Sequence, residues 1–194
     1  MTKRKPAEVL RILSIDTSLS SPGFAVVEIR NRKPKLVAVD HVKPRGDEPY
    51  VLRTKHIESW LHLFVRQHRP FDVIVREGFN AKFESSNYPV FSAWASVDRV
   101  LYDFGYVIVE KSISPTTVKR LMTDQTRKVT KQQVEDGVRK FIELPVGFAF
   151  KKDDESDAVG IALSWALENG LIDDVIEREK KPKAKSKRKK TKKE

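Results

Sequence analysis

From residue 10 to residue 42 the chain reads LRILSIDTSLSSPGFAVVEIRNRKPKLVAVDHV. Its apolar residues form three short runs of the kind typical of strands, and two turn sequences, Ser20-Ser-Pro-Gly23 and Asn31-Arg-Lys-Pro34, separate the runs. Because short turns join strands that lie side by side, we expect an antiparallel meander of three strands.

Helical and strand patterns alternate in the rest of the chain. The expected elements are a helix at about 49–68, a strand at 71–77, a helix at about 89–104, a strand at 106–109 and helices at about 115–122, 131–142 and 154–168. Thr130 and Gln133 are spaced as a capping box at the start of one of these helices. Strands first, then alternation, predict an α/β fold: a mixed five-stranded sheet flanked by helices, with the later strands joined by crossovers.

The positive charge of the chain is concentrated at one end. The 194 residues carry a formal net charge of +11, and the stretch 178–194, with eleven basic and two acidic residues, holds +9 of it. We therefore divide the chain into a basic N-terminal arm (1–9), one domain (10–177) and a lysine-rich tail (178–194) that is disordered when free. Such a tail binds nucleic acid by neutralising phosphates, although a solubility or targeting role is the alternative.

Several classes of protein are excluded by composition. The chain has no Cys, so disulfides, thiolate metal sites and cysteine nucleophiles are impossible. No apolar run approaches the roughly 18 residues of a membrane-spanning helix, and the N-terminus lacks the apolar segment of a secretory signal. We expect a soluble cytoplasmic protein with no membrane partner.

Four carboxylates stand at the ends of predicted elements. Asp16 closes the first strand, Glu77 closes the strand at 71–77, and Asp154 and Asp157 lie on one face of the first turn of the last helix. Each has an ordinary explanation by itself: the two helix residues suit the helix dipole, Glu77 could pair with a Lys, and Asp16 could belong to a turn.

Together, however, these four carboxylates would require a cation. Two carboxylates 4 Å apart repel by up to about 4 kcal/mol at an effective dielectric near 20. Oxygen ligands favour Mg²⁺ or Mn²⁺, and two such ions about 4 Å apart support phosphodiester hydrolysis.

Three segments that contain these acids carry a family resemblance. They are Ile12-Leu-Ser-Ile-Asp16-Thr-Ser-Leu-Ser-Ser-Pro-Gly23-Phe24, Val73-Ile-Val-Arg-Glu77 and Asp154-Glu-Ser-Asp157-Ala-Val-Gly-Ile-Ala162. In order and spacing they resemble the RuvC family of Holliday junction resolvases, which have a ribonuclease H-like fold. The resemblance implies that Asp16, Glu77, Asp154 and Asp157 bind two Mg²⁺ ions, with Mn²⁺ able to substitute. Asp153 replaces Asp154 if the helix begins one residue earlier.

The same resemblance implies residues that bind DNA. Lys119 and Lys131 match two lysines that contact DNA near the active site, although solvated lysines are common in a lysine-rich chain. The loop after Glu77 contains Phe79, Lys82 and Phe83, whose aromatic rings could stack on unpaired bases. The family has a base-contacting Phe in this loop, at a position that falls on Asn80 here, so Phe79 or Phe83 would have to serve.

The helix at 89–104 has a broad apolar face, on which Trp94 is the expected dimer contact; the alternative is a helix buried wholly within one chain. Family members are homodimers that act on four-way DNA. The resemblance therefore implies a Mg²⁺-dependent endonuclease that resolves Holliday junctions by paired incisions in recombination, repair or viral DNA processing. A nuclease for flaps, forks or other branched DNA is one alternative. A non-catalytic nucleic-acid-binding protein on the same fold is another.

Overall fold

A four-stranded mixed sheet runs through the computed structural model, which describes residues 9–78, 84–107 and 112–178. In the order β3-β2-β1-β4, the strands of this sheet are β3 (Lys33–His41), β2 (Gly23–Arg30), β1 (Leu10–Asp16) and β4 (Val73–Arg76). The first three pair antiparallel, which confirms the meander, and β4 runs parallel to β1 after a helical crossover.

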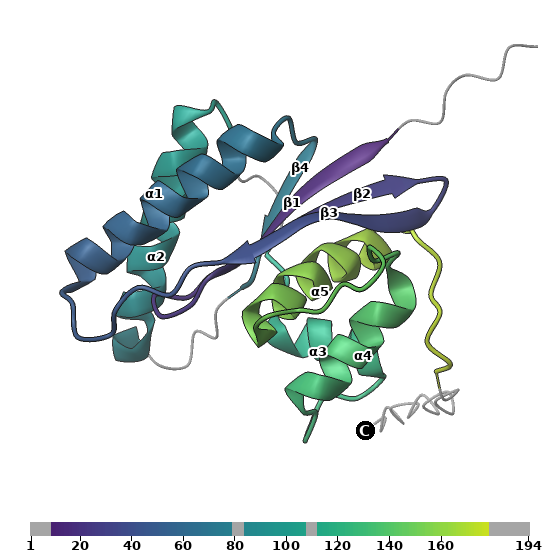
Figure 1. Ribbon diagram of the computed structural model, residues 1–194. Coiled ribbons are helices and arrows are strands. Elements are labelled where there is room, and N and C mark those ends of the chain that lie inside the picture. Colours follow the sequence, from purple (N-terminus) through teal and green to yellow (C-terminus); the bar gives the residue numbers. More distant parts are fainter. Residues whose placement is uncertain (1–8, 79–83, 108–111, 179–194) are drawn as a thin grey trace, which may run out of the picture.

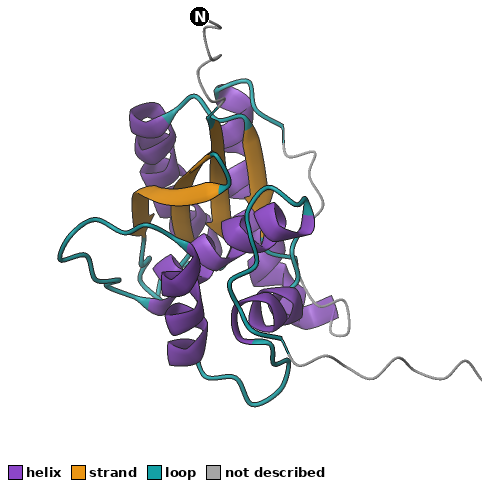
Figure 2. Cartoon of the chain, turned by 90° about the vertical axis from the view of Figure 1, so that its right-hand side faces the viewer, coloured by secondary structure: helices purple, strands orange, loops and turns teal. Residues whose placement is uncertain are grey.

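Helices cover both faces of the sheet (Figure 1). One face carries α1 (Tyr50–His68) and α2 (Glu84–Asp103), and the other carries α3 (Pro115–Thr123), α4 (Lys131–Phe141) and α5 (Asp153–Glu168). Figure 2 shows the sheet with helices in front of it and behind it. The described chain is therefore one α/β domain with a hydrophobic core on each side of the sheet.

The strand period of two assigns the residues of β1 to opposite faces. Leu13 and Ile15 enter the core beneath α1 and α2, whereas Ile12 enters the core beneath α5. Ser14 also faces α5, because its hydroxyl donates to the carbonyl of Ala158 at 2.7 Å. Asp16, two residues further along, is thereby directed toward α5 as well.

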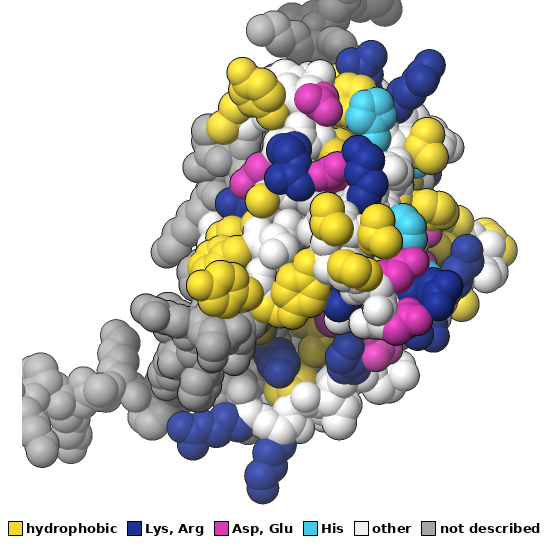
Figure 3. Space-filling view, turned by 90° about the vertical axis from the view of Figure 1, so that its left-hand side faces the viewer, with side chains coloured by type: hydrophobic (Ala, Val, Ile, Leu, Met, Phe, Trp, Pro, Cys, Tyr) yellow, Lys and Arg dark blue, Asp and Glu magenta, His cyan; other side chains and the backbone are white. Residues whose placement is uncertain are grey.

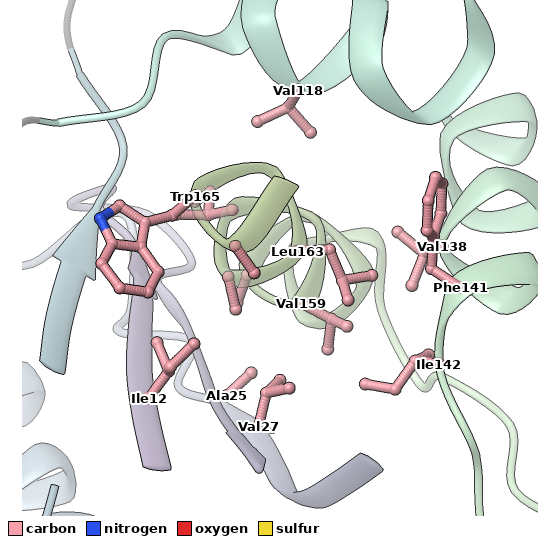
Figure 4. Close-up of a cluster of buried hydrophobic side chains, with 14 of the residues drawn as sticks. Ile12, Ala25, Val27, Val118, Val138, Phe141, Ile142, Val159, Leu163 and Trp165 are labelled. Carbon is pink, nitrogen blue, oxygen red and sulfur yellow. The ribbon is translucent and has the colours of Figure 1, made fainter. Parts of the chain in front are cut away.

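Helix α5 lies at the centre of the second core. Figure 4 shows its Val159, Leu163 and Trp165 between the sheet and the residues of α3 and α4. Almost every α5 residue from Glu155 to Ala166 is buried, so this helix cannot shift without disturbing the whole core. The acidic first turn of α5 is consequently held in a rigid position.

Two predicted elements differ from the structure. The fifth strand, expected at 106–109, is not formed at Tyr106 and Val107, and its other two residues lie outside the described part of the chain. The chain does return beside β4, where Ile113 and Glu77 form a single parallel bridge. Helix α2 begins at Glu84 rather than near Pro89, and this proline lies inside the helix.

The remaining helices lie close to their predicted ranges. The capping box of Thr130 and Gln133 is present at the start of α4. Helix α5 begins at Asp153, one residue before the predicted start, and three acidic residues in its first turn complement the helix dipole. None of the helices in the described ranges has the length and hydrophobicity needed to cross a bilayer.

Candidate active site

Asp16 and Glu77 meet at the ends of two adjacent parallel strands. Asp16 is the last residue of β1, and Glu77 follows β4 directly, with its N–H donating to the carbonyl of Ile15 at 3.0 Å. Their side chains are close enough for a hydrogen bond between the two carboxyl groups. Asp16 is only 8% exposed, so this contact lies inside the protein.

The first turn of α5 brings two further carboxylates near enough for their charges to raise the pKa of Asp16. Asp154 and Asp157 are three residues apart and therefore share one face of the helix. Asp154 is held by Ser21, whose hydroxyl donates to its Oδ2 at 2.7 Å. The helix approaches β2 so closely that a Cβ on Gly23 would lie 2.0 Å from the carbonyl oxygen of Asp154.

Burial, more than mutual repulsion, raises the pKa of three of the four acids. Burial, followed by the charges of Glu77, Asp157 and Asp154, raises the pKa of Asp16 well above its usual value. Burial raises the pKa of Glu77 to about 7, although the Asp16 hydrogen bond opposes this rise. Burial likewise raises the pKa of Asp157 to about 6, against the lowering effect of Lys131.

The donor chemistry of these side chains suits a cation. All the ligand atoms on offer are carboxylate oxygens, which hard divalent ions such as Mg²⁺ prefer. Buried carboxylates that repel one another and share a proton are stabilised when a cation replaces that proton. Asp16, Glu77, Asp154 and Asp157 are the residues that would hold it.

Two lysines border the acids. The Nζ of Lys131 lies 3.3 Å from Asp153 Oδ2 and 3.8 Å from Asp157 Oδ2. The charge of Lys119 lowers the pKa of both Glu77 and Asp157. A cavity of about 210 Å³ opens between these groups, with Glu77, Lys119, Lys131 and Asp157 in its wall. The structure thus brings the two predicted lysines to the predicted acids.

The neighbouring residues Asp153 and Asp154 differ in their exposure and in their contacts. Asp153 is exposed and forms an ion pair with Lys131. Asp154 is half-buried, and its charge contributes to the raised pKa of Asp16, while the charges of both residues raise the pKa of Asp157. Because α5 begins at Asp153, this residue remains the alternative to Asp154 as the third ligand.

The remaining predicted site residues lie apart from this cluster or outside the described chain. Phe79, Lys82 and Phe83 are outside the described residues. Trp94 is half-buried on α2, with the guanidinium of Arg76 4.0 Å from the centre of its ring. Much of the exposed surface of this layer is apolar, as Figure 3 shows for the face that α1 and α2 form.

A second group of ligand-type side chains has partners within the chain. Asp40, His41 and Glu155 have ligand atoms within 4.8 Å of one another. The Oε1 of Glu155 is 2.9 Å from His41 Nδ1, and its Oε2 accepts from the backbone N–H of Lys151 at 2.8 Å. Because the buried carboxylate is already satisfied, we assign this group to fastening α5 onto β3.

Comparisons with known proteins point to one family. The sequence pattern of the family "Crossover junction endodeoxyribonuclease RuvC" matches residues 12–165. The protein of that name from Brachyspira hyodysenteriae is 24% identical over 84% of this chain and 98% of its own length. The one from Methylorubrum populi is 29% identical over 84% of this chain and 83% of its own.

Among solved structures, T. thermophilus RuvC in complex with Holliday junction substrate superposes with a TM-score of 0.68 at 23% identity, covering 82% of this chain and 94% of that one. At this level of identity the match shows the fold alone. It confirms the fold that the three motifs indicate.

Proposed function

The chain belongs to the RuvC family of crossover junction endodeoxyribonucleases, and on this basis we propose that it resolves Holliday junctions by paired, metal-dependent phosphodiester hydrolysis. The products are nicked duplexes with 5′-phosphate and 3′-hydroxyl ends that a ligase can seal. The observation that carries the proposal is the buried contact between the carboxyl groups of Asp16 and Glu77, beside the acidic first turn of α5.

We infer that Asp16, Glu77, Asp154 and Asp157 hold two Mg²⁺ ions, and that Mn²⁺ can replace them. When bound, such ions activate a water molecule and stabilise the leaving 3′-oxygen. The protein would supply the ligands from three rigid elements, which hold the carboxylates in fixed positions. Burial of Asp16 excludes water from the inner side of the site and strengthens its interaction with a cation.

Lys119 and Lys131 then hold the DNA backbone against the acids. Both lysines lie in the wall of the cavity that Glu77 and Asp157 also line. A phosphate bound there would pair with Lys131, which would then give up its ion pairs with Asp153 and Asp157. The loop residues Phe79, Lys82 and Phe83 are proposed to stack on bases at the crossover. The lysine-rich tail adds affinity for any nucleic acid.

A homodimer would place two such sites on the opposed strands of a symmetric junction. Tyr102, Leu63 and Phe91, on α1 and α2, are 75%, 62% and 44% exposed, which is unusual for large apolar side chains. Trp94 belongs to the same layer and remains the predicted interface contact. Sedimentation of the full chain should give twice the monomer mass; a monomer at micromolar concentration would contradict this part of the proposal. The cytoplasm remains the predicted location.

The direct test offers synthetic four-way junctions, flaps and linear duplexes to the full chain, with Mg²⁺ and with a chelator. We expect rapid Mg²⁺-dependent cleavage of the junction, with symmetric cuts on two strands, and none with the chelator. Equal rates on all three substrates would show a nuclease of broader specificity. Junction binding without cleavage under any metal would favour a non-catalytic protein.

A further inference from the structure

A buried arginine on α1 contacts the loop that follows Asp16, and none of the expected functions uses it. Arg53, on the first turns of α1, is 8% exposed. One terminal nitrogen, Nη2, donates to the carbonyl of Leu19 and to the hydroxyl of Ser20, each at 3.1 Å. Within the described residues its Nε, also buried, has no hydrogen-bond partner.

Burying an arginine lowers the free energy of unfolding unless the side chain gains interactions that offset the loss of its hydration. Burying a charge with incomplete hydrogen bonding is unfavourable, and a hydrophobic side chain of similar size is often at least as stable in such a place. Both hydrogen bonds of Arg53 go to the connection between β1 and β2, residues 17–22, and its guanidinium also lies 5.8 Å from the centre of the Tyr50 ring. This loop begins immediately after Asp16.

The same loop leads to the third acid. Ser21 directly follows Leu19 and Ser20, which accept hydrogen bonds from Arg53. The hydroxyl of Ser21 donates to Asp154 Oδ2 at 2.7 Å. The side chain of Leu19 also holds the loop in place, because it is 3% exposed and packs in the core beneath α1 and α2. A continuous line of contacts therefore runs from α1, on one face of the sheet, to the acidic turn of α5 on the other.

We propose that Arg53 is a positioning residue for the active site: it fixes the 17–22 loop so that Ser21 orients the Asp154 carboxylate as a metal ligand. Without this support the carboxylate of Asp154 can rotate away from Asp16. The loss would appear first in metal affinity, because outer contacts to a ligand typically change affinity or activity by about 10- to 100-fold. The inference rests on the proposed metal-dependent function.

The test uses the full chain and four variants. Arg53→Met keeps the volume of the side chain but removes its donors, and Arg53→Lys restores one charged donor. Ser21→Ala removes the hydroxyl at a half-buried position, where unfolding is not expected. Lys55→Met, at an exposed position of the same helix, is the matched control.

Mn²⁺ binding is measured calorimetrically without DNA, alongside thermal unfolding and the Mg²⁺ dependence of junction cleavage. We expect Arg53→Met and Ser21→Ala each to weaken Mn²⁺ binding about tenfold, Arg53→Lys to recover part of the loss, and Lys55→Met to match wild type. The double variant Arg53→Met, Ser21→Ala should bind no more weakly than Arg53→Met alone, since both act through one contact.

Unchanged Mn²⁺ affinity in folded Arg53→Met, or losses that add fully in the double variant, would overturn the positioning role. If Arg53→Met does not fold, Ser21→Ala decides alone: wild-type Mn²⁺ affinity in that variant would remove the link to Asp154. A failure of the proposed function would look different, because the wild-type chain would then bind Mn²⁺ and leave junctions intact.

Discussion

The carboxyl groups of Asp16 and Glu77 lie within hydrogen-bonding distance at the ends of two parallel strands, and Asp16 is almost wholly buried. The pKa of Asp16 is raised well above its usual value and that of Glu77 to about 7, so in the metal-free protein this pair holds a proton more tightly than free carboxyl groups do. A divalent cation would displace that proton. Proton and metal therefore compete at this pair of residues.

The metal-free protein should accordingly lose stability as pH rises. The pKa of Glu77 is raised from 4.5 to about 7 in the folded chain, so the folded state holds a proton that the unfolded chain has already released. Its contribution to stability is complete below pH 4.5 and is lost as pH rises through 7. Mg²⁺ should therefore raise the midpoint of thermal unfolding more at pH 8 than at pH 5.5.

Glu77→Gln is the control for this pH effect, since an amide has no proton to release. That variant should show a smaller change of unfolding temperature with pH when metal is absent. An equal effect of Mg²⁺ at both pH values in the wild-type chain would contradict the competition.

Asp157→Asn should abolish junction cleavage while DNA binding persists. The substitution removes one negative charge and a metal ligand but leaves a side chain of the same size on α5. We expect a fall in cleavage rate of at least 1,000-fold, about 4 kcal/mol of transition-state stabilisation, with unchanged or tighter binding of a labelled junction in a gel-shift assay. Substantial residual cleavage would remove Asp157 from the mechanism.

Gly23→Ala should damage both stability and the metal site. Its Cβ would lie 2.0 Å from the Asp154 carbonyl oxygen, so β2 and the first turn of α5 must separate. Gly137→Ala is a matched control, because its Cβ would lie 2.1 Å from the Met122 carbonyl oxygen, between α3 and α4. Both variants should unfold at lower temperature, but only Gly23→Ala should lose Mn²⁺ affinity in calorimetry.

Lys131→Ala should weaken DNA binding without regard to sequence. A lysine that contacts one phosphate contributes about one unit to the slope of log affinity against log salt, so the slope should fall by about one. Lys140→Ala, at an exposed position of the same helix, should leave cleavage unchanged. A Lys131 variant with wild-type salt dependence would show that this lysine serves only Asp153 and Asp157.

Deletion of 179–194 should lower affinity for all nucleic acids while the preference for junctions persists. The deletion begins after Arg178, although the sequence predicts this residue as the first of the tail. Arg178 donates to the carbonyls of Arg120 and Leu121 at the end of α3 and so belongs to the domain. Competition between labelled junction and duplex at several salt concentrations measures both quantities. Loss of the preference would give the tail a specific role.

The sequence by itself determined the parts of this protein that depend on local pattern. Strand alternation in residues 10–42 specified the meander, and the three acidic motifs specified which elements carry the candidate ligands. Local pattern failed at two places: α2 continues through Pro89, and Tyr106 and Val107 do not pair as a strand.

Only the tertiary structure decided how the acids meet. The packing of α5 on the sheet lets the charge of Asp154 act on Asp16 and pairs Asp153 with Lys131. Sequence reasoning missed Arg53 and Ser21, because nothing in a turn sequence or a helical arginine indicates a contact across 33 or 133 residues. Side-chain chemistry is local to each residue, whereas burial, repulsion and metal affinity arise only when the folded chain brings such groups together.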